Sequence, residues 1–103
     1  MSDFKIPSEI QLMCRTIKTV YEGDLGYKKD LRGEARYRQN TIAIQACTED
    51  VPIPYEQQIE TFYHEMLHWI FNLIERQDLN DDEKLVEMAG KLLTQALITA
   101  RYE

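Results

Sequence analysis

Five consecutive residues near the middle of the chain, His64-Glu65-Met66-Leu67-His68, have the types and spacing needed for metal chemistry. Histidines at i and i+4 lie on one face of a helix, close enough for both imidazoles to bind the same tetrahedral Zn²⁺. Glu65 is turned by about 100° from His64, beside the metal and outside its ligand set, where it can take a proton from the water that zinc activates. The pattern predicts zinc as the cofactor, with His64 and His68 as ligands and Glu65 as the general base.

The helix that must carry these residues is predicted from Tyr55 to Arg76, where apolar residues recur with helical spacing. On a helical wheel, His64 and His68 lie nearly opposite the apolar stripe, so they are not expected to belong to the core. The alternative to metal binding is a pair of surface histidines. The stripe consists of Ile59, Phe62, Met66, Ile70 and Leu73, with Trp69 and Ile74 on its flanks.

A catalytic zinc needs three protein ligands and an open position for water, so a third ligand must exist. Glu83 and Glu87 are four residues apart at the start of a predicted last helix, on the same side as Gly90. The missing side chain of Gly90 would let that side approach another helix closely. We therefore expect Glu83 to be the third ligand. The alternative is that both carboxylates face water, as charged residues opposite an apolar stripe usually do.

The last helix is expected to begin after Asn80 or Asp81, either of which can cap its first turn. Acidic residues in that turn are favoured by the helix dipole. The apolar stripe expected to face the core consists of Leu85, Ala89, Leu92, Leu93, Ala96 and Ala100.

Strand and turn signals fill the first half of the chain. The run from Glu9 to Tyr21 alternates apolar and polar residues with one slip near Arg15 and Thr16, which indicates one bulged strand or two short strands. A hairpin turn at Gln39-Asn40 is expected to lead into a strand from Thr41 to Gln45. Further turns are expected at Gly23, Asp24, Gly26 and Gly33, and Pro52 and Pro54 are expected to stop any strand.

The predicted fold class is α+β: a small antiparallel sheet of about three strands, then an active-site helix and a C-terminal glutamate helix. At 103 residues the whole chain, 1–103, fits a single domain. A formal charge of −6 argues against nucleic-acid binding, because binding to phosphates needs clustered cations. The one basic stretch is interpreted as a solvated loop and strand edge, with an acidic partner as the alternative. It comprises Lys28, Lys29, Arg32, Arg36 and Arg38.

The two cysteines, Cys14 and Cys47, are not in a metal-ligand spacing. We expect both to be buried and reduced, which suits the cytosol, although either could replace Glu83 as the third ligand. The most apolar stretch, Met66 to Ile74, is too short to span a bilayer, and no secretory signal is visible. The expected location is cytoplasmic, with no membrane contact.

His64-Glu65-Met66-Leu67-His68 followed by Glu83-x-x-x-Glu87 resembles the gluzincins, the thermolysin-like clan of zinc metallopeptidases. The layout of the whole chain is most similar to minigluzincins and to small zincin-like proteins of phages and prophages. The resemblance implies that His64, His68 and Glu83 bind zinc and that Glu65 acts as general base and acid. It also implies that Glu87 hydrogen-bonds a ligand histidine, where the family often has an aspartate.

The function implied by this resemblance is zinc-dependent hydrolysis of peptide bonds in a peptide or protein substrate. The strand from Thr41 to Gln45 is expected either to pair with an extended substrate, as an edge strand of zincins does, or to be an ordinary strand. A tyrosine is expected to stabilise the oxyanion, and Tyr37, Tyr55 and Tyr102 are available. Two other functions stay open: a zinc-stabilised interaction module without useful turnover, and a protein-binding domain without metal.

Overall fold

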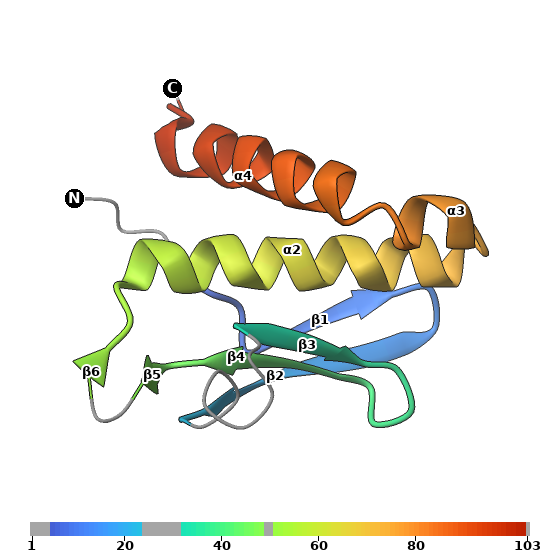
Figure 1. Ribbon diagram of the computed structural model, residues 1–103, viewed down its shortest axis with the longest axis horizontal. Coiled ribbons are helices and arrows are strands. Elements are labelled where there is room, and N and C mark those ends of the chain that lie inside the picture. Colours follow the sequence, from blue (N-terminus) through green and yellow to red (C-terminus); the bar gives the residue numbers. More distant parts are fainter. Residues whose placement is uncertain (1–4, 24–31, 49–50, 103) are drawn as a thin grey trace.

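The computed structural model describes residues 5–23, 32–48 and 51–102, and the side chains of residues 47, 48 and 51 are not described. A sheet lies against one side of a long central helix, and a second long helix covers the opposite side of that helix (Figure 1). The strands are β1 (Glu9–Leu12), β2 (Arg15–Glu22), β3 (Gly33–Arg36), β4 (Thr41–Gln45), β5 (Cys47–Thr48) and β6 (Val51–Pro52). The helices are α2 (Tyr55–Leu73), α3 (Gln77–Asn80) and α4 (Glu83–Thr99).

The sheet has four strands in the order β1-β2-β4-β3, and it is mixed. β1 and β2 are antiparallel, as are β3 and β4, but β2 and β4 are parallel neighbours. The prediction of a small sheet preceding two long helices is confirmed, but the sheet is mixed and not antiparallel, and in the described residues it has four strands where about three were expected. The chain passes from β2 to the outer edge, forms β3 and then returns as β4 between them, a path that alternation of residues cannot reveal.

β4 has the predicted bounds, but it is an interior strand, so its backbone is already paired on both sides. The idea that the strand Thr41–Gln45 pairs with a substrate is therefore wrong. β3 is the edge strand next to β4, and it packs against α2. An extended chain that joins the sheet on the side of β4 would pair with β3.

The strand register separates the sheet into two faces. Ile17 pairs with Ile10 in β1, and Ile42 pairs with Ala35 in β3, so these side chains share the face that meets α2. The indole Nε1 of Trp69 also donates to the backbone oxygen of Thr41 across this interface. The buried core comprises Ile6, Ile17, Ile42, Ile44, Ile59, Phe62, Tyr63 and Trp69.

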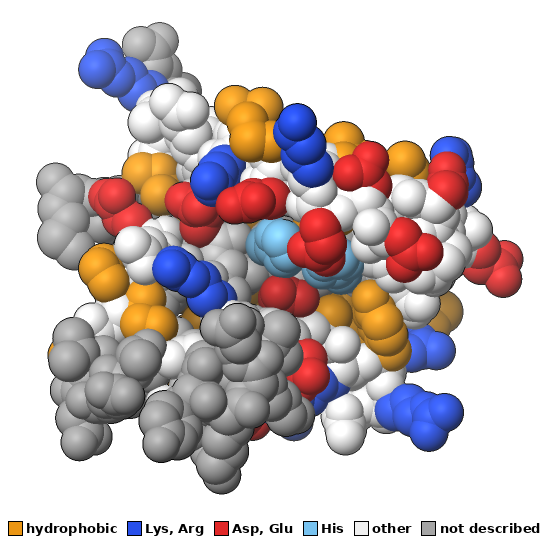
Figure 2. Space-filling model, viewed as in Figure 1, with side chains coloured by type: hydrophobic (Ala, Val, Ile, Leu, Met, Phe, Trp, Pro, Cys, Tyr) orange, Lys and Arg blue, Asp and Glu red, His pale blue; other side chains and the backbone are white. Residues whose placement is uncertain are grey.

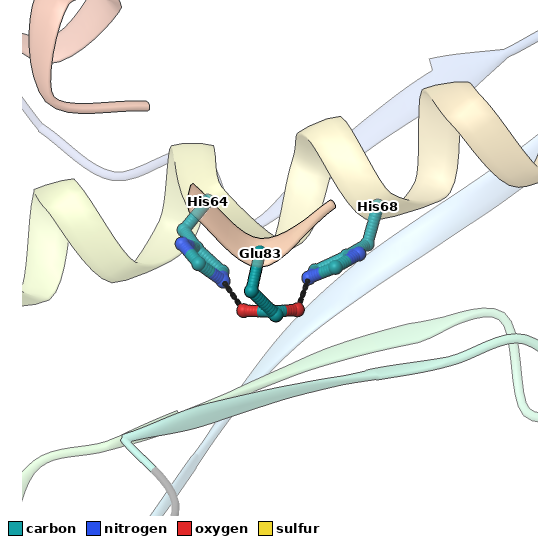
Figure 3. A group of neighbouring side chains, drawn as sticks. All are labelled: His64, His68 and Glu83. Atoms are coloured by element: carbon teal, nitrogen blue, oxygen red, sulfur yellow. Dashed lines mark ion pairs between the residues drawn. The ribbon is translucent and has the colours of Figure 1, made fainter. Parts of the chain in front are cut away.

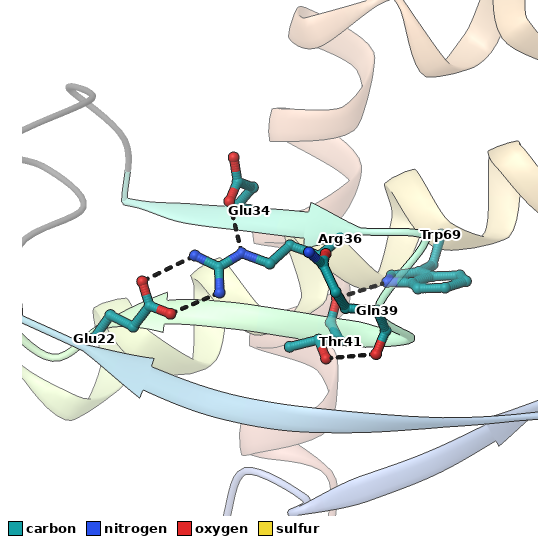
Figure 4. A network of polar contacts seen from close by, with 6 residues as sticks. All are labelled: Glu22, Glu34, Arg36, Gln39, Thr41 and Trp69. Carbon is teal, nitrogen blue, oxygen red and sulfur yellow. Dashed lines mark hydrogen bonds and ion pairs between the residues drawn. The ribbon is translucent and has the colours of Figure 1, made fainter.

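The other face of the sheet carries an ionic network (Figure 4). The guanidinium of Arg36 in β3 donates to both carboxylate oxygens of Glu22 in β2, at 2.6 and 2.9 Å, and to Glu34 at 2.7 Å. It therefore crosses β4, where Ala43 pairs with Glu34 and is fully buried. Two charged hydrogen bonds of this fork geometry hold the edge strand β3 in place beside α2.

α4 buries a different face from the one predicted. Val86, Gly90 and Thr94 are its buried residues, whereas Leu85 and Leu92 are exposed. The expected stripe through Leu85 and Leu92 is therefore wrong, because the small side chains at and around Gly90 allow closer packing on α2. The prediction that the side bearing Gly90 approaches another helix is confirmed.

The strands, turns and cysteines of the first half of the chain agree only in part with the predictions. The run from Glu9 to Tyr21, predicted as one bulged strand or two short strands, forms two strands, β1 and β2. The turn that joins them contains Met13, which has a φ of 55°. Cys14 lies in this turn and is exposed, so its predicted burial is wrong. Pro52 does not prevent strand pairing, because it pairs with Cys47 in the small β5-β6 sheet. The predicted turn residues Asp24 and Gly26, the basic residues Lys28 and Lys29, and the side chain of Cys47 lie outside what is described.

None of the helices in the described ranges combines the length and the apolarity that a membrane-spanning helix requires.

Candidate metal centre

The three predicted ligands meet in one place (Figure 3). Nε2 of His68 lies 2.8 Å from one carboxylate oxygen of Glu83, and Nε2 of His64 lies 3.4 Å from the other. One ligand atom from each residue falls within 4.8 Å of the other two. α2 supplies both histidines, and Glu83 is the first residue of α4. The structure thus brings together the residues that the sequence selected.

Close packing of α4 on α2 makes this meeting possible. A Cβ atom added at Gly90 would lie 3.3 Å from Cα and 3.4 Å from the backbone nitrogen of His64. Ala at this position would require the backbone of His64 to shift by a few tenths of an ångström, and larger side chains would require more. The side chain of Asp82 accepts a hydrogen bond from the backbone of Leu85, so Asp82 caps α4, and the predicted caps Asn80 and Asp81 are wrong.

Asn80 has a different role, at the end of the short helix α3. Its Oδ1 lies 2.6 Å from Nδ1 of His68, and its Nδ2 donates to the hydroxyl of Tyr37 at 3.3 Å. Asn80 is buried, with 8% of its surface exposed. Sequence reasoning missed this contact because Asn80 looked like a helix cap. The only available signal was an amide close before Glu83, which does not identify a partner.

Glu65 lies outside the three-residue group and is buried, with 8% of its surface exposed. Burial raises the pKa of its carboxyl from 4.5 to about 7; the nearby charge of His68 opposes this rise and those of Glu83 and Glu34 add to it. A backbone hydrogen bond from Ala35 in β3 also favours the charged form. A carboxyl with a pKa near neutrality is suited to exchange protons at physiological pH.

Gly33, the first residue of β3, makes room for Glu65. A Cβ atom at this position would collide with Cγ2 of Thr61, and it would lie 3.2 Å from Cγ of Glu65. The sequence indicated only a turn at Gly33. The structure shows that a residue without a side chain is required where β3 crosses α2.

The electrostatics also favour a neutral imidazole at His64, the form that can act as a ligand. Burial and the neighbouring His68 lower the pKa of His64, while the charges of Glu83 and Glu87 and a hydrogen bond with Glu83 act in the opposite direction. A lower pKa keeps this imidazole neutral, and only a neutral imidazole can bind a metal ion.

Glu87 lies one turn after Glu83, and its carboxylate pairs with Lys91 at 3.4 Å. Its charge acts on His64, as described above, whereas the polar partner on Nδ1 of His68 is Asn80. A supporting role of Glu87 toward a ligand histidine stays a prediction, limited by this geometry to His64.

The three candidate tyrosines lie in different environments. Tyr37 is half-buried, and its hydroxyl belongs to the Asn80 contact beside His68. The hydroxyl of Tyr55 instead accepts from the backbone of Ile6 at 2.8 Å, and Tyr102 is 86% exposed. Burial raises the pKa of Tyr37, with the hydrogen bond from Asn80 opposing this rise and the charges of Glu65 and Glu83 adding to it. Tyr37 is therefore the one of the three tyrosines whose hydroxyl bonds to the surroundings of the histidines.

An open cavity of about 390 Å³ lies beside His64 and Glu65. Figure 2 shows the histidines reaching the surface among acidic side chains. Among the described residues, every side chain that lines this cavity is polar or charged. Besides His64 and Glu65, these are Arg32, Gln57, Glu60, Thr61, Glu87 and Lys91.

The donor set fits zinc. Two imidazoles and one carboxylate are the protein ligands of many catalytic zinc sites, and three ligands leave a fourth tetrahedral position for water or substrate. Comparison of the chain with protein-family models, curated proteins and solved structures found no match. The function is therefore inferred from the geometry and chemistry of the site alone.

Proposed function

We propose that this protein is a zinc-dependent metallopeptidase of the gluzincin type. The observation that carries the proposal is the convergence of His64, His68 and Glu83, with buried Glu65 beside them and outside the ligand set. A site that only stores or binds zinc has no need for a carboxyl with a pKa of about 7 at this position. The combination of an open zinc site and an adjacent base is what hydrolysis requires.

His64, His68 and Glu83 would hold the ion in this account. When bound, zinc supplies Lewis acidity toward a carbonyl oxygen and toward water. The carboxylate of Glu65 removes a proton from the attacking water and then delivers it to the nitrogen of the leaving amine. The backbone hydrogen bond from Ala35 in β3 holds that carboxylate in place, and its burial raises its pKa and so strengthens it as a base.

The substrate is proposed to be an extended peptide that adds to the outer edge of β3, where no other strand of the described residues pairs. This strand is at the end of the sheet, and its Ala35 already contacts Glu65, so a chain paired with β3 would pass the site. The side chains of the adjacent cavity that belong to the described part of the chain are all polar or charged. The cavity is therefore expected to accept a polar side chain of the peptide in preference to a large apolar one.

A zinc-stabilised interaction module is the second candidate. It is favoured by the exposed apolar residues of α4, where Leu85, Met88 and Leu92 are 38%, 51% and 61% exposed. Grouped apolar side chains at a surface often mark a contact with another protein.

The two functions are separated by Glu65→Gln, which keeps the shape of the side chain but cannot accept the proton. The peptidase proposal predicts that zinc occupancy stays near wild type while cleavage of a peptide library is lost. Glu56→Gln, in the exposed first turn of the same helix and not among the residues that line the cavity, is the matched control and should retain cleavage. Equal cleavage by wild type and Glu65→Gln would contradict the assigned role. A zinc-loaded wild type that cleaves nothing would favour the interaction module.

A further inference from the structure

A chain of hydrogen bonds runs from the sheet to a candidate metal ligand. The hydroxyl of Tyr37, just after β3, donates to the backbone oxygen of His68 at 3.3 Å and accepts from Nδ2 of Asn80 at 3.3 Å. Oδ1 of Asn80 then faces Nδ1 of His68 at 2.6 Å. Three separate elements therefore converge on one imidazole.

The Tyr37 hydroxyl determines which groups donate and which accept in this series of hydrogen bonds. A tyrosine hydroxyl has a single proton, and Tyr37 uses it on the backbone oxygen of His68. Toward Asn80 the hydroxyl can then only accept, so the amide must present Nδ2 to Tyr37 and Oδ1 to His68. Because an amide oxygen cannot donate, Nδ1 of His68 must carry a proton. Nε2, which faces a carboxylate oxygen of Glu83 at 2.8 Å, is then the nitrogen that gives its lone pair to a metal when one binds.

The reverse arrangement would be unable to bind a metal through Nε2. It requires Asn80 to turn its amide, donate from Nδ2 to Nδ1 of His68 and accept the proton of Tyr37. Tyr37 would then lose its bond to the backbone of His68, and Nε2 would hold the proton that faces Glu83. The two arrangements use the same side chains, so the position of the Tyr37 proton decides between them.

Packing keeps Tyr37 in position for this role. Its ring meets that of Trp69 edge to face, with centroids 5.1 Å apart and an interplanar angle of 79°. Trp69 is fully buried and Asn80 is 8% exposed, so the amide of Asn80 is largely shielded from water. Buried polar groups of this kind are expensive to leave without partners.

We propose that Tyr37, acting through Asn80, fixes Nε2 of His68 as the nitrogen that faces the metal. Both are positioning residues, because neither is among the proposed ligands. The usefulness of this arrangement rests on the proposed zinc site, but its existence can be tested in the metal-free protein. The turn after β3 would thereby control a ligand on α2.

The first test is ¹⁵N NMR of the imidazoles in the metal-free protein at neutral pH. The chain has only two histidines, so His64→Gln identifies the signals of His68. Nδ1 of His68 is expected to show the shift of a protonated nitrogen in wild type and in Asn80→Asp, whose carboxylate also accepts. An unprotonated Nδ1 in wild type would overturn the proposal. In Tyr37→Phe, some molecules should have an unprotonated Nδ1 of His68. A spectrum identical to that of wild type would show that Tyr37 does not orient Asn80.

The second test is zinc affinity, measured by competition with a chelator. Asn80→Leu, which has nearly the same size but no acceptor, should weaken binding about 10–100-fold, the usual cost of losing a hydrogen bond to a ligand histidine. Tyr37→Phe, which removes one buried hydrogen bond, should weaken it roughly 2–10-fold. Asn80→Asp should bind at least as tightly as wild type. A purely structural role predicts that Asn80→Asp and Asn80→Leu are impaired alike, which would refute the proposal.

The two measurements fail independently. If wild type binds no zinc while Nδ1 of His68 is protonated, the proposed function is wrong and the positioning by Tyr37 and Asn80 stands. If wild type binds zinc but Nδ1 of His68 is unprotonated in the metal-free protein, the proposed function survives and this inference is wrong.

Discussion

Replacing Glu65 by Gln should remove a pH-dependent part of the stability of the metal-free protein. Burial raises the pKa of Glu65 from 4.5 to about 7 in the folded chain. The folded state therefore holds the proton more tightly than the unfolded state, and the wild type loses stability as pH rises from about 4.5 through about 7. At about 1.4 kcal/mol per pKa unit, the difference between the two pKa values corresponds to ~3 kcal/mol.

The free energy of unfolding is best measured with urea, in the presence of a chelator, by fluorescence of the single tryptophan. Relative to wild type, Glu65→Gln should gain ~3 kcal/mol between pH 4.5 and pH 8, and most of this gain should fall below pH 7. If the Gln amide changes the free energy of unfolding by an amount that does not depend on pH, that amount cancels when the two pH values are compared. Glu56→Gln removes an exposed carboxyl from the first turn of the same helix and is the matched control.

Parallel pH profiles for wild type and Glu65→Gln would refute the reasoning, because they would mean that burial of Glu65 does not disfavour its charge. Zinc provides a further check. Its positive charge favours the carboxylate, so saturating zinc should reduce the difference between the two proteins.

Three other outcomes follow from the same contacts. Gly90→Ala should weaken zinc binding with little change in Tm, because the added methyl separates His64 from α4 while Ala gains about 1 kcal/mol of helix propensity; unchanged zinc affinity would show that the close contact does not position Glu83. Gly33→Ala should destabilise the fold by about 1–3 kcal/mol, the usual cost of overpacking, because the added methyl group would press against Thr61 and Glu65. A urea unfolding midpoint equal to that of wild type would contradict this. A chelator should lower Tm by about 10–20 °C relative to protein at a free zinc concentration 100 times its Kd, and scanning calorimetry that shows no shift would argue against a folded-state zinc site.

The grouping of His64, His68 and Glu83 could be predicted largely from spacing within single segments of the chain. His64 and His68 are brought together by the helix repeat itself. Glu83 required one further inference, that the side bearing Gly90 packs against another helix, and the structure confirms this packing. Both steps rest on patterns within one segment of the chain.

The remaining features depend on which segments meet. α4 is apolar on two sides, and composition alone could not show that the side with Val86 would be buried while Leu92 stayed exposed. The contact of Asn80 with His68 depends on where the short helix α3 places its last residue, and Tyr37 reaches it from the sheet. The parallel pairing of β2 and β4 is likewise a property of the chain path.

Competitive zinc titration of wild type, Glu83→Ala and Glu87→Ala tests the central claim most directly. The proposed site predicts that wild type binds one zinc per chain and that Glu83→Ala loses most of this affinity, because a ligand and its charge are removed. Glu87→Ala, one turn later on the same helix, should weaken binding by no more than about 10–100-fold, since Glu87 does not contact the metal in this arrangement. Wild type that takes up no zinc after refolding with an excess of the metal, or Glu83→Ala that binds as tightly as wild type, would contradict the account.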